Sequence, residues 1–163
     1  MNPAAKGLPV VDLRPGEIHI APEPTLITTL LGSCVGVCLY SSSRKIGAMS
    51  HSVLPVPHNS LCESDVRYVE CALERILMQL KGMEVPRHDI KAKIFGGAQM
   101  FHVRGGPARL VGEGNVEAAR RFLKAARVGI VSEGVGGMGG RKLYFNSATG
   151  EVVVRNIAGG PRP

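Results

Sequence analysis

Short apolar runs, separated by polar or glycine-rich segments, occur throughout the chain and predict β-strands. The longest run, TLITTLLGSCVGVCLY at 25–40, is followed after a short polar segment by IGAMSHSVLP at 46–55. Both runs are rich in β-branched and apolar residues, so they predict a β-hairpin closed by the four-residue loop 41–44. The alternating segment EIHIA at 17–21 predicts an edge strand before this hairpin.

Two stretches repeat apolar residues at the three- and four-residue spacing of an amphipathic helix. The first predicts a helix over 64–82, which begins at Ser64 and Asp65 and ends at a glycine. The second stretch, within 116–126, predicts a helix that Asn115 opens as its N-cap.

Further strands are predicted around and after the second helix. KAKIFGGAQMF at 91–101 predicts a strand that kinks at its two glycines, and a short strand is expected at 129–132. A glycine-rich loop at 134–141 then leads into a hairpin at 142–156. The resulting order, β-β-α-β-α-β-β-β, predicts an α+β fold in which two helices pack on layered, mixed or antiparallel β-sheets.

The length of 163 residues suits one domain with one hydrophobic core. We expect this domain to cover residues 1–157. The remaining residues, 158–163, contain no core residue and are expected to form a flexible C-terminal tail.

Lys and Arg outnumber Asp and Glu by 20 to 13, which gives a formal net charge of +7. The basic residues are scattered, and no aromatic or helix-turn-helix motif accompanies them, so we expect no nucleic-acid binding. The charge instead favours electrostatic steering toward an acidic protein partner.

No apolar run reaches the ~18 residues that a bilayer-spanning helix needs, because Thr, Gly and Ser interrupt the run at 25–40. The N-terminal segment also lacks the apolar core of a secretion signal. We therefore expect no membrane insertion and a cytoplasmic location.

The four cysteines are Cys34, Cys38, Cys62 and Cys71. We expect free thiols, because nothing in the sequence indicates secretion. Cys34 and Cys38 would lie about 13 Å apart on one strand, too far for a disulfide. A zinc site at these two cysteines would lack a second closely spaced ligand pair, so we expect no metal and no cofactor.

The hairpin brings a cysteine and a histidine together. If Tyr40 faces Lys45 across the loop, Cys34 lies directly opposite His51, where an imidazole can accept a proton from a thiol. The Gly and Ser that precede Cys34 allow a backbone bend that exposes the thiol. Cysteine and histidine in apolar strands are more often plain core residues, so this alternative stays open.

A third group is needed to orient the imidazole, and no Asp or Glu is close in sequence to Cys34 or His51. Thr28 could supply the oxygen if the chain folds back near Gly32. The backbone N–H groups of Ser33 and Cys34 are the candidate oxyanion hole.

Several of these segments resemble the chemoreceptor glutamine deamidases of the CheD family. The similarity covers roughly residues 10–157 and is carried by TTLLGSCVGVCLY, IGAMSHSVLP, KIFGGAQMF, GNVEAA and GRKLYFNSATGEVVVRN. The most specific elements are LGSCV and the H-x-x-LP that follows it. The chain is thus similar to this family over nearly its whole length.

This resemblance implies hydrolysis of glutamine side-chain amides to glutamate on methyl-accepting chemotaxis receptors, with release of ammonia. It also implies two kinds of partner, the cytoplasmic domains of these receptors and a CheC-type phosphatase. The implied fold is similar to the catalytic domain of cytotoxic necrotizing factor, a toxin deamidase.

By position, the resemblance implies Cys34 as the nucleophile, His51 as the base and Thr28 as the residue that orients the base. We expect Cys34 and His51 to rest as a thiolate–imidazolium pair, which would make Cys34 the thiol most reactive toward iodoacetamide. Four positions differ from residues more usual in the family and could change glutamine choice or partner binding; they are Ser41, Gly134, Met138 and Gly139.

The residues and the resemblance together predict a cysteine-dependent protein-glutamine glutaminase. Two alternatives remain at this stage. One is a different thiol amidase or a transglutaminase that uses the same dyad. The other is a non-catalytic protein that only binds and regulates a chemotaxis phosphatase, for which Cys34 would be dispensable.

Overall fold

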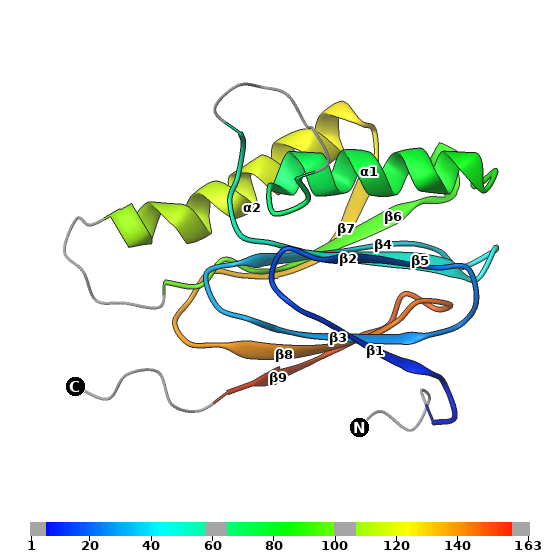
Figure 1. Ribbon diagram of the computed structural model, residues 1–163, viewed down its shortest axis with the longest axis horizontal. Helices are drawn as coiled ribbons and strands as arrows, with labels where there is room; N and C mark the ends of the chain where they lie inside the picture. The colour runs from blue at the N-terminus through cyan, green and yellow to red at the C-terminus, as the bar shows by residue number, and fades with distance from the viewer. Residues whose placement is uncertain (1–5, 58–64, 100–106, 158–163) are drawn as a thin grey trace.

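The computed structural model describes residues 6–57, 65–99 and 107–157 and has three layers (Figure 1). Two α-helices cover one face of a five-stranded sheet, and a four-stranded sheet packs against its other face. We call these the covered sheet and the outer sheet. No helix lies on the free face of the outer sheet among the residues drawn as ribbon.

Each sheet contains one parallel pair of strands and is otherwise antiparallel. In spatial order, the outer sheet contains β1 (Val10–Leu13), β3 (Leu26–Leu31), β8 (Arg141–Asn146) and β9 (Val152–Asn156). In spatial order, the covered sheet contains β2 (Ile18–Ala21), β5 (Ile46–Ser52), β4 (Val35–Ser41), β6 (Lys91–Gly96) and β7 (Gly129–Val135). The predicted α+β class with two helices is therefore confirmed, and both sheets are mixed.

The helices are α1 (Val69–Gly82) and α2 (Pro107–Ala125), and a short 3-10 helix spans Arg87–Asp89. The apolar stripe of α1 is buried on the covered sheet, as its spacing predicts. Helix α2 makes the crossover that the parallel pair β6–β7 requires.

Both helices begin at residues other than those expected. Helix α1 starts at Val69, with no side-chain cap, because the chain first forms a parallel bridge between Leu54 and Tyr68. The predicted start at Ser64 lies outside the described residues. Helix α2 starts eight residues before Asn115, so Asn115 is not an N-cap.

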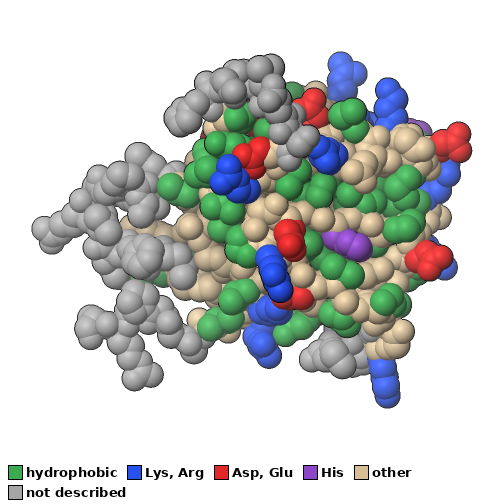
Figure 2. All heavy atoms as spheres, viewed as in Figure 1, with side chains coloured by type: hydrophobic (Ala, Val, Ile, Leu, Met, Phe, Trp, Pro, Cys, Tyr) green, Lys and Arg blue, Asp and Glu red, His purple; other side chains and the backbone are tan. Residues whose placement is uncertain are grey.

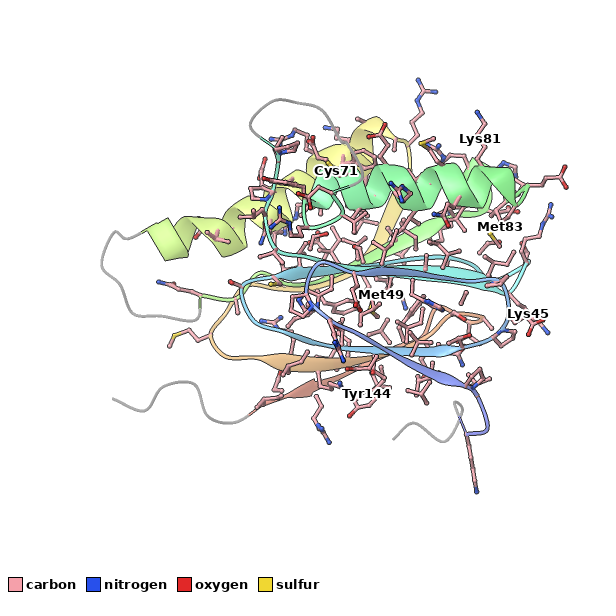
Figure 3. All side chains as sticks on the ribbon, viewed as in Figure 1. Lys45, Met49, Cys71, Lys81, Met83 and Tyr144 are labelled. Carbon is pink, nitrogen blue, oxygen red and sulfur yellow. The ribbon has the colours of Figure 1, made fainter. Side chains whose placement is uncertain are left out.

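Two apolar clusters fill the spaces between the layers. One lies between the helices and the covered sheet, and the other lies between the two sheets. Met49 belongs to the second cluster, and Figure 3 shows its side chain between the sheets. His51 lies on the same strand and is only 2% exposed. The cluster between the sheets is thus the low-dielectric surrounding of the candidate site.

The predicted long strand over 25–40 is divided in the structure. Its first half is β3 of the outer sheet and its second half is β4 of the covered sheet, with a bend at 32–34 between them. Continuous apolar patterning could not distinguish one strand from two, because both halves are buried. The sequence pattern does not predict β1, because its four residues lie in a Pro- and Gly-rich part of the chain.

The cysteines are in different states. Cys34 and Cys38 are free, as expected. Cys71, which lies at the start of α1 (Figure 3), is disulfide-bonded. The expectation of free thiols is therefore wrong for Cys71. Cys62 lies outside the described residues.

Lys and Arg are interspersed with Asp and Glu on the face shown in Figure 2. This mixture agrees with the scattered charges of the sequence. Within the part of the chain that the structure describes, no helix is long and apolar enough to span a membrane.

Candidate active site

The loop that carries Cys34 crosses from the outer sheet to the covered sheet, and its three carbonyl groups are all held. Gly32 accepts a hydrogen bond from the Ala98 N–H at 2.9 Å, and Cys34 accepts one from the Gly97 N–H at 2.9 Å. The Ser33 carbonyl accepts from the side-chain amide of Asn115 at 3.1 Å. The Cys34 side chain is half-buried. The loop is thus a supported bend that leaves its thiol accessible.

His51 lies on β5 and faces the space between the sheets. The β4–β5 register pairs it with Gly36, so the expected direct opposition of Cys34 and His51 is wrong. The hairpin loop covers 42–45 instead of 41–44, which shifts the register by two residues. Cys34 directly precedes β4, two residues before the Gly36 that pairs with His51. It packs against the apolar cluster between the sheets, the space that His51 also faces.

Thr29 on β3 holds the His51 ring. Its hydroxyl oxygen is 2.7 Å from Nδ1 of His51 and 2.9 Å from the carbonyl oxygen of Leu13. A carbonyl can only accept, so the single hydroxyl proton of Thr29 goes to Leu13 and Thr29 accepts from Nδ1–H. This pattern assigns the tautomer that leaves Nε2 of His51 with a free lone pair.

Thr28 does not make the contact expected of it. Its hydroxyl donates to Asp12 at 2.5 Å, and Asp12 also accepts from the Lys142 ammonium at 2.9 Å. Adjacent residues of a strand point to opposite faces of the sheet, so Thr28 and Thr29 cannot both reach His51. The structure corrects the orienting contact from Thr28 to Thr29, which sequence position alone could not distinguish.

Burial shifts both candidate catalytic groups toward their neutral forms. Desolvation lowers the pKa of His51 to about 4, and the negative charges of Asp12 and Glu17 only partly oppose this shift. Desolvation also raises the pKa of the Cys34 thiol, although its own backbone N–H acts in the opposite direction. These directions contradict the expected resting thiolate–imidazolium pair. Burial thus favours a thiol and a neutral imidazole at rest.

A second loop, the glycine-rich segment after β7, supports the Cys34 loop from outside. The Arg141 guanidinium donates to the carbonyls of Gly134 and Gly136. Gly136 in turn donates to Gly96, and the Gly137 carbonyl accepts from the Gln99 N–H at 2.9 Å. The sequence predicts only a loop over 134–141, because Arg141 at its end gives no sign of where its side chain points.

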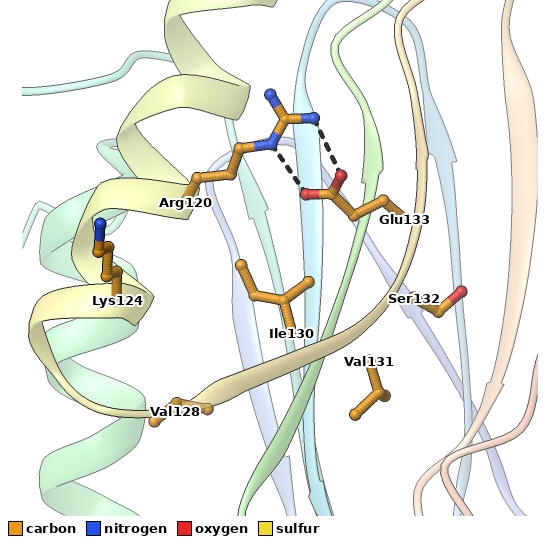
Figure 4. A pocket seen from close by; sticks show the side chains of 7 residues that line it. All are labelled: Arg120, Lys124, Val128, Ile130, Val131, Ser132 and Glu133. Carbon is orange, nitrogen blue, oxygen red and sulfur yellow. Dashed lines mark hydrogen bonds and ion pairs between the residues drawn. The ribbon is translucent and has the colours of Figure 1, made fainter.

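Two of the hollows that border α2 also border β7 or the segment that follows it. A groove of about 640 Å³ runs between α2 and the edge strand β7 (Figure 4). Arg120 and Glu133 form a bidentate ion pair in it. The groove contains none of the candidate catalytic residues. A smaller hollow of about 250 Å³ is bordered by Gly97, Gly136 and Val116, beside the loop that supports Cys34. Among the described residues, no group of three or more His, Cys, Asp or Glu could hold a metal.

Comparison with known proteins relates this site to one family. The family model described as "CheD chemotactic sensory transduction" matches residues 53–156. The chain belongs to the CheD family. The matched segment begins after His51, and the CheD relatives described next extend the similarity over most of the chain.

Three relatives show the extent of this similarity. The "Probable chemoreceptor glutamine deamidase CheD 2" of Geobacter sulfurreducens is 35% identical over 150 residues, 92% of this chain and 91% of the relative. The "Probable chemoreceptor glutamine deamidase CheD 1" of Anaeromyxobacter dehalogenans is 37% identical over 96% of this chain and 90% of its own. The "Chemoreceptor glutamine deamidase CheD" of Thermotoga maritima is 36% identical over 89% of this chain and 90% of its own.

Proposed function

We propose that this CheD-family chain is a cysteine-dependent deamidase that converts glutamine side chains of chemoreceptors to glutamate. The observation that carries the proposal is the buried His51, which Thr29 holds with Nε2 free and whose β4 partner, Gly36, is two residues from Cys34. The names of its CheD relatives supply the substrate class. A nucleophile beside an oriented base is the arrangement that thioester chemistry needs.

The reaction has two stages. In the first, Nε2 of His51 takes the thiol proton of Cys34 while sulfur bonds to the amide carbon of glutamine. The carbon–nitrogen bond then breaks, and the imidazolium returns the proton to the leaving ammonia. In the second, His51 takes a proton from water, whose oxygen displaces sulfur and leaves glutamate. Cys34 regains its proton, so no metal or cofactor is required.

The oxyanion of each stage needs hydrogen-bond donors. We propose the backbone N–H groups of Ser33 and Cys34 for this role. The carbonyls of Gly32, Ser33 and Cys34 are engaged by the supporting segments, which fixes the peptide planes of the bend. Hydrogen bonding by the Cys34 N–H lowers the pKa of its own thiol, so this donor acts close to the reacting sulfur.

We also propose the partners, the cellular location and the domain bounds of this protein. The partners are chemoreceptor cytoplasmic domains and a CheC-type phosphatase, and the location is the cytoplasm. We further propose that residues 1–157 form one deamidase domain, followed by a tail at 158–163. Its layered fold is proposed to be similar to the catalytic domain of cytotoxic necrotizing factor.

Mass spectrometry of a receptor cytoplasmic fragment tests the function. Incubation with the protein in ordinary water should raise the mass by about 1 Da per converted glutamine, and in ¹⁸O-water by about 3 Da, because water supplies the new oxygen. Addition of a primary amine should give no adduct. An amine adduct would indicate a transglutaminase, and an unchanged receptor would leave a non-catalytic binding protein and overturn the proposal.

A further inference from the structure

Asn115 occupies an unusual position for its residue type. It lies in the interior of α2 and is completely buried. Asn is a poor helix former, because its side chain competes for backbone hydrogen bonds. In this helix the side chain instead points out of α2 and makes two hydrogen bonds to other segments. The low helix propensity of Asn at this position is therefore accompanied by hydrogen bonds from its side chain to other segments.

The two bonds join the two halves of the candidate site. The Asn115 amide nitrogen donates to the Ser33 carbonyl at 3.1 Å and to the Val53 carbonyl at 3.0 Å. Ser33 directly precedes Cys34, and Val53 follows His51 by two residues. One side-chain NH₂ group thus connects the loop of the nucleophile to the strand end of the base.

The chemistry of this bridge is specific for an amide. Both partners are backbone carbonyls, which only accept, and an NH₂ group supplies one proton to each. An Asp of the same shape would present oxygen to both carbonyls and lose both bonds. The Asn115 carbonyl oxygen has no hydrogen-bond partner among the described residues, so the NH₂ group carries the whole connection.

Helix α2 packs directly against the backbone near the site, so the position of Asn115 is fixed. A Cβ added at Gly112 would lie 2.7 Å from the Gly97 carbonyl oxygen and 2.9 Å from that of Ala98. The helix therefore touches the backbone of the segment that holds Gly32 and Cys34. Movement of Asn115 relative to this segment is restricted by direct backbone contact.

We propose that Asn115 is a positioning residue that sets the spacing between Cys34 and His51. The proposal rests on the deamidase function proposed above and adds a residue to it. Asn115 does not touch the reacting atoms; it acts through the Ser33 and Val53 carbonyls. Loss of its NH₂ group would release the Cys34 loop from β5 and misalign the thiol with Nε2.

The test compares two buried asparagines. Asn115→Asp keeps the shape of the side chain and removes both donors. Asn146→Asp is the matched control, because Asn146 is the last residue of β8 and, among the described residues, its side chain acts only through its oxygen, as acceptor for the Ala148 N–H. We expect Asn115→Asp to lower kcat on a receptor fragment about 100-fold with little change in KM, and Asn146→Asp to retain activity.

A second readout needs no receptor. Asn115→Ala should let the Cys34 loop open, which exposes the thiol and brings its raised pKa back toward the ordinary value. Iodoacetamide should then alkylate Cys34 at neutral pH several-fold faster than in the wild-type protein, while Cys38 stays protected in the core. This readout also remains valid if the wild-type protein proves inactive on receptors, so failures of the two proposals are distinguishable.

Two results would overturn the positioning role. One is a folded Asn115→Asp or Asn115→Ala protein with wild-type kcat and an unchanged Cys34 alkylation profile. The other is unfolding of both variants under conditions where Asn146→Asp stays folded, which would make Asn115 a residue of fold stability only.

Discussion

At the scale of single residues, the neighbouring threonines of β3 have different roles. Thr29 fixes the tautomer of His51, whereas Thr28 bonds Asp12 on the opposite face of the outer sheet. Replacing Thr29 by Ala should therefore lower kcat by about tenfold or more, because the base remains but loses its orientation. Thr29→Ser should retain most of the wild-type activity, because Ser keeps the hydroxyl that contacts His51.

Thr28→Ala is the matched control for this substitution, and steady-state kinetics on a receptor fragment compares the two. We expect Thr28→Ala to change kcat much less than Thr29→Ala, and His51→Ala to be more damaging than either. A larger loss in Thr28→Ala than in Thr29→Ala would contradict the assigned hydrogen-bond pattern.

The protonation states of Cys34 and His51 give a second prediction at this scale. Burial raises the pKa of Cys34 and lowers that of His51 to about 4. Wild-type Cys34 should therefore react with iodoacetamide more slowly at neutral pH than an ordinary exposed thiol, and its rate should rise steadily toward alkaline pH. Peptide mass spectrometry after timed alkylation measures this rate. Fast alkylation near pH 6.5 would contradict this prediction and support a resting thiolate–imidazolium pair.

The candidate catalytic residues were only partly predictable from the sequence. The predicted hairpin brought Cys34 and His51 together, and the register error of two residues leaves His51 on the same face of β5. Thr29 could not be chosen over Thr28, since the choice depends on which sheet face β3 turns toward His51. The pattern predicts Asn115 as a helix cap, and its real partners, Ser33 and Val53, cannot be predicted because they are distant in the sequence.

At the scale of elements, the close contact between α2 and the segment after β6 supports the Cys34 loop. Gly97 has a φ of +64°, and a Cβ there would clash with Val116 and lie 2.9 Å from the Gly112 carbonyl oxygen. Gly97→Ala should cost about 1–3 kcal/mol in the free energy of unfolding and also displace the Gly97 N–H from Cys34.

Denaturant unfolding and receptor deamidation, measured on the same samples, test this expectation. Gly129→Ala is the control, because a Cβ at Gly129 meets no described atom within 4 Å and needs no positive φ. We expect kcat to fall only in Gly97→Ala. Equal stability and activity of the two variants would show that the α2 contact does not support the loop.

The sequence predicted most elements but not how they divide between sheets. The terminal hairpin, α1, α2 and the strand before α2 all follow local apolar patterns. The division of 25–40 into β3 and β4 is a tertiary effect, because both strands are buried whichever sheet they join. The parallel pair β1–β3 likewise depends on a contact between strands that are not consecutive in the chain.

At the scale of the whole molecule, the buried His51 links folding to pH. The unfolded chain binds a proton on this residue near its ordinary pKa of 6.5, and the folded protein binds it only near 4. Between these values unfolding takes up a proton, so stability falls as the pH falls from 6.5 to 4. The loss from His51 alone is about 3 kcal/mol.

Denaturant unfolding at several pH values, in wild-type and His51→Gln proteins, isolates this contribution. Carboxylates titrate in the same range in both proteins, so the difference between the two curves reports His51. The wild-type curve should be the steeper one in this window. Parallel curves would mean that His51 keeps an ordinary pKa in the folded protein.

The central claim, that Cys34 is the nucleophile of a receptor deamidase, is tested most directly by comparing Cys34→Ala with Cys38→Ala. Both cysteines are free, but Cys38 is fully buried between the sheets and only Cys34 lies in the supported bend. The measurement is the gain of about 1 Da per glutamine on a receptor fragment. We predict no gain with Cys34→Ala and continued conversion with folded Cys38→Ala. Conversion by Cys34→Ala at the wild-type rate would contradict the account.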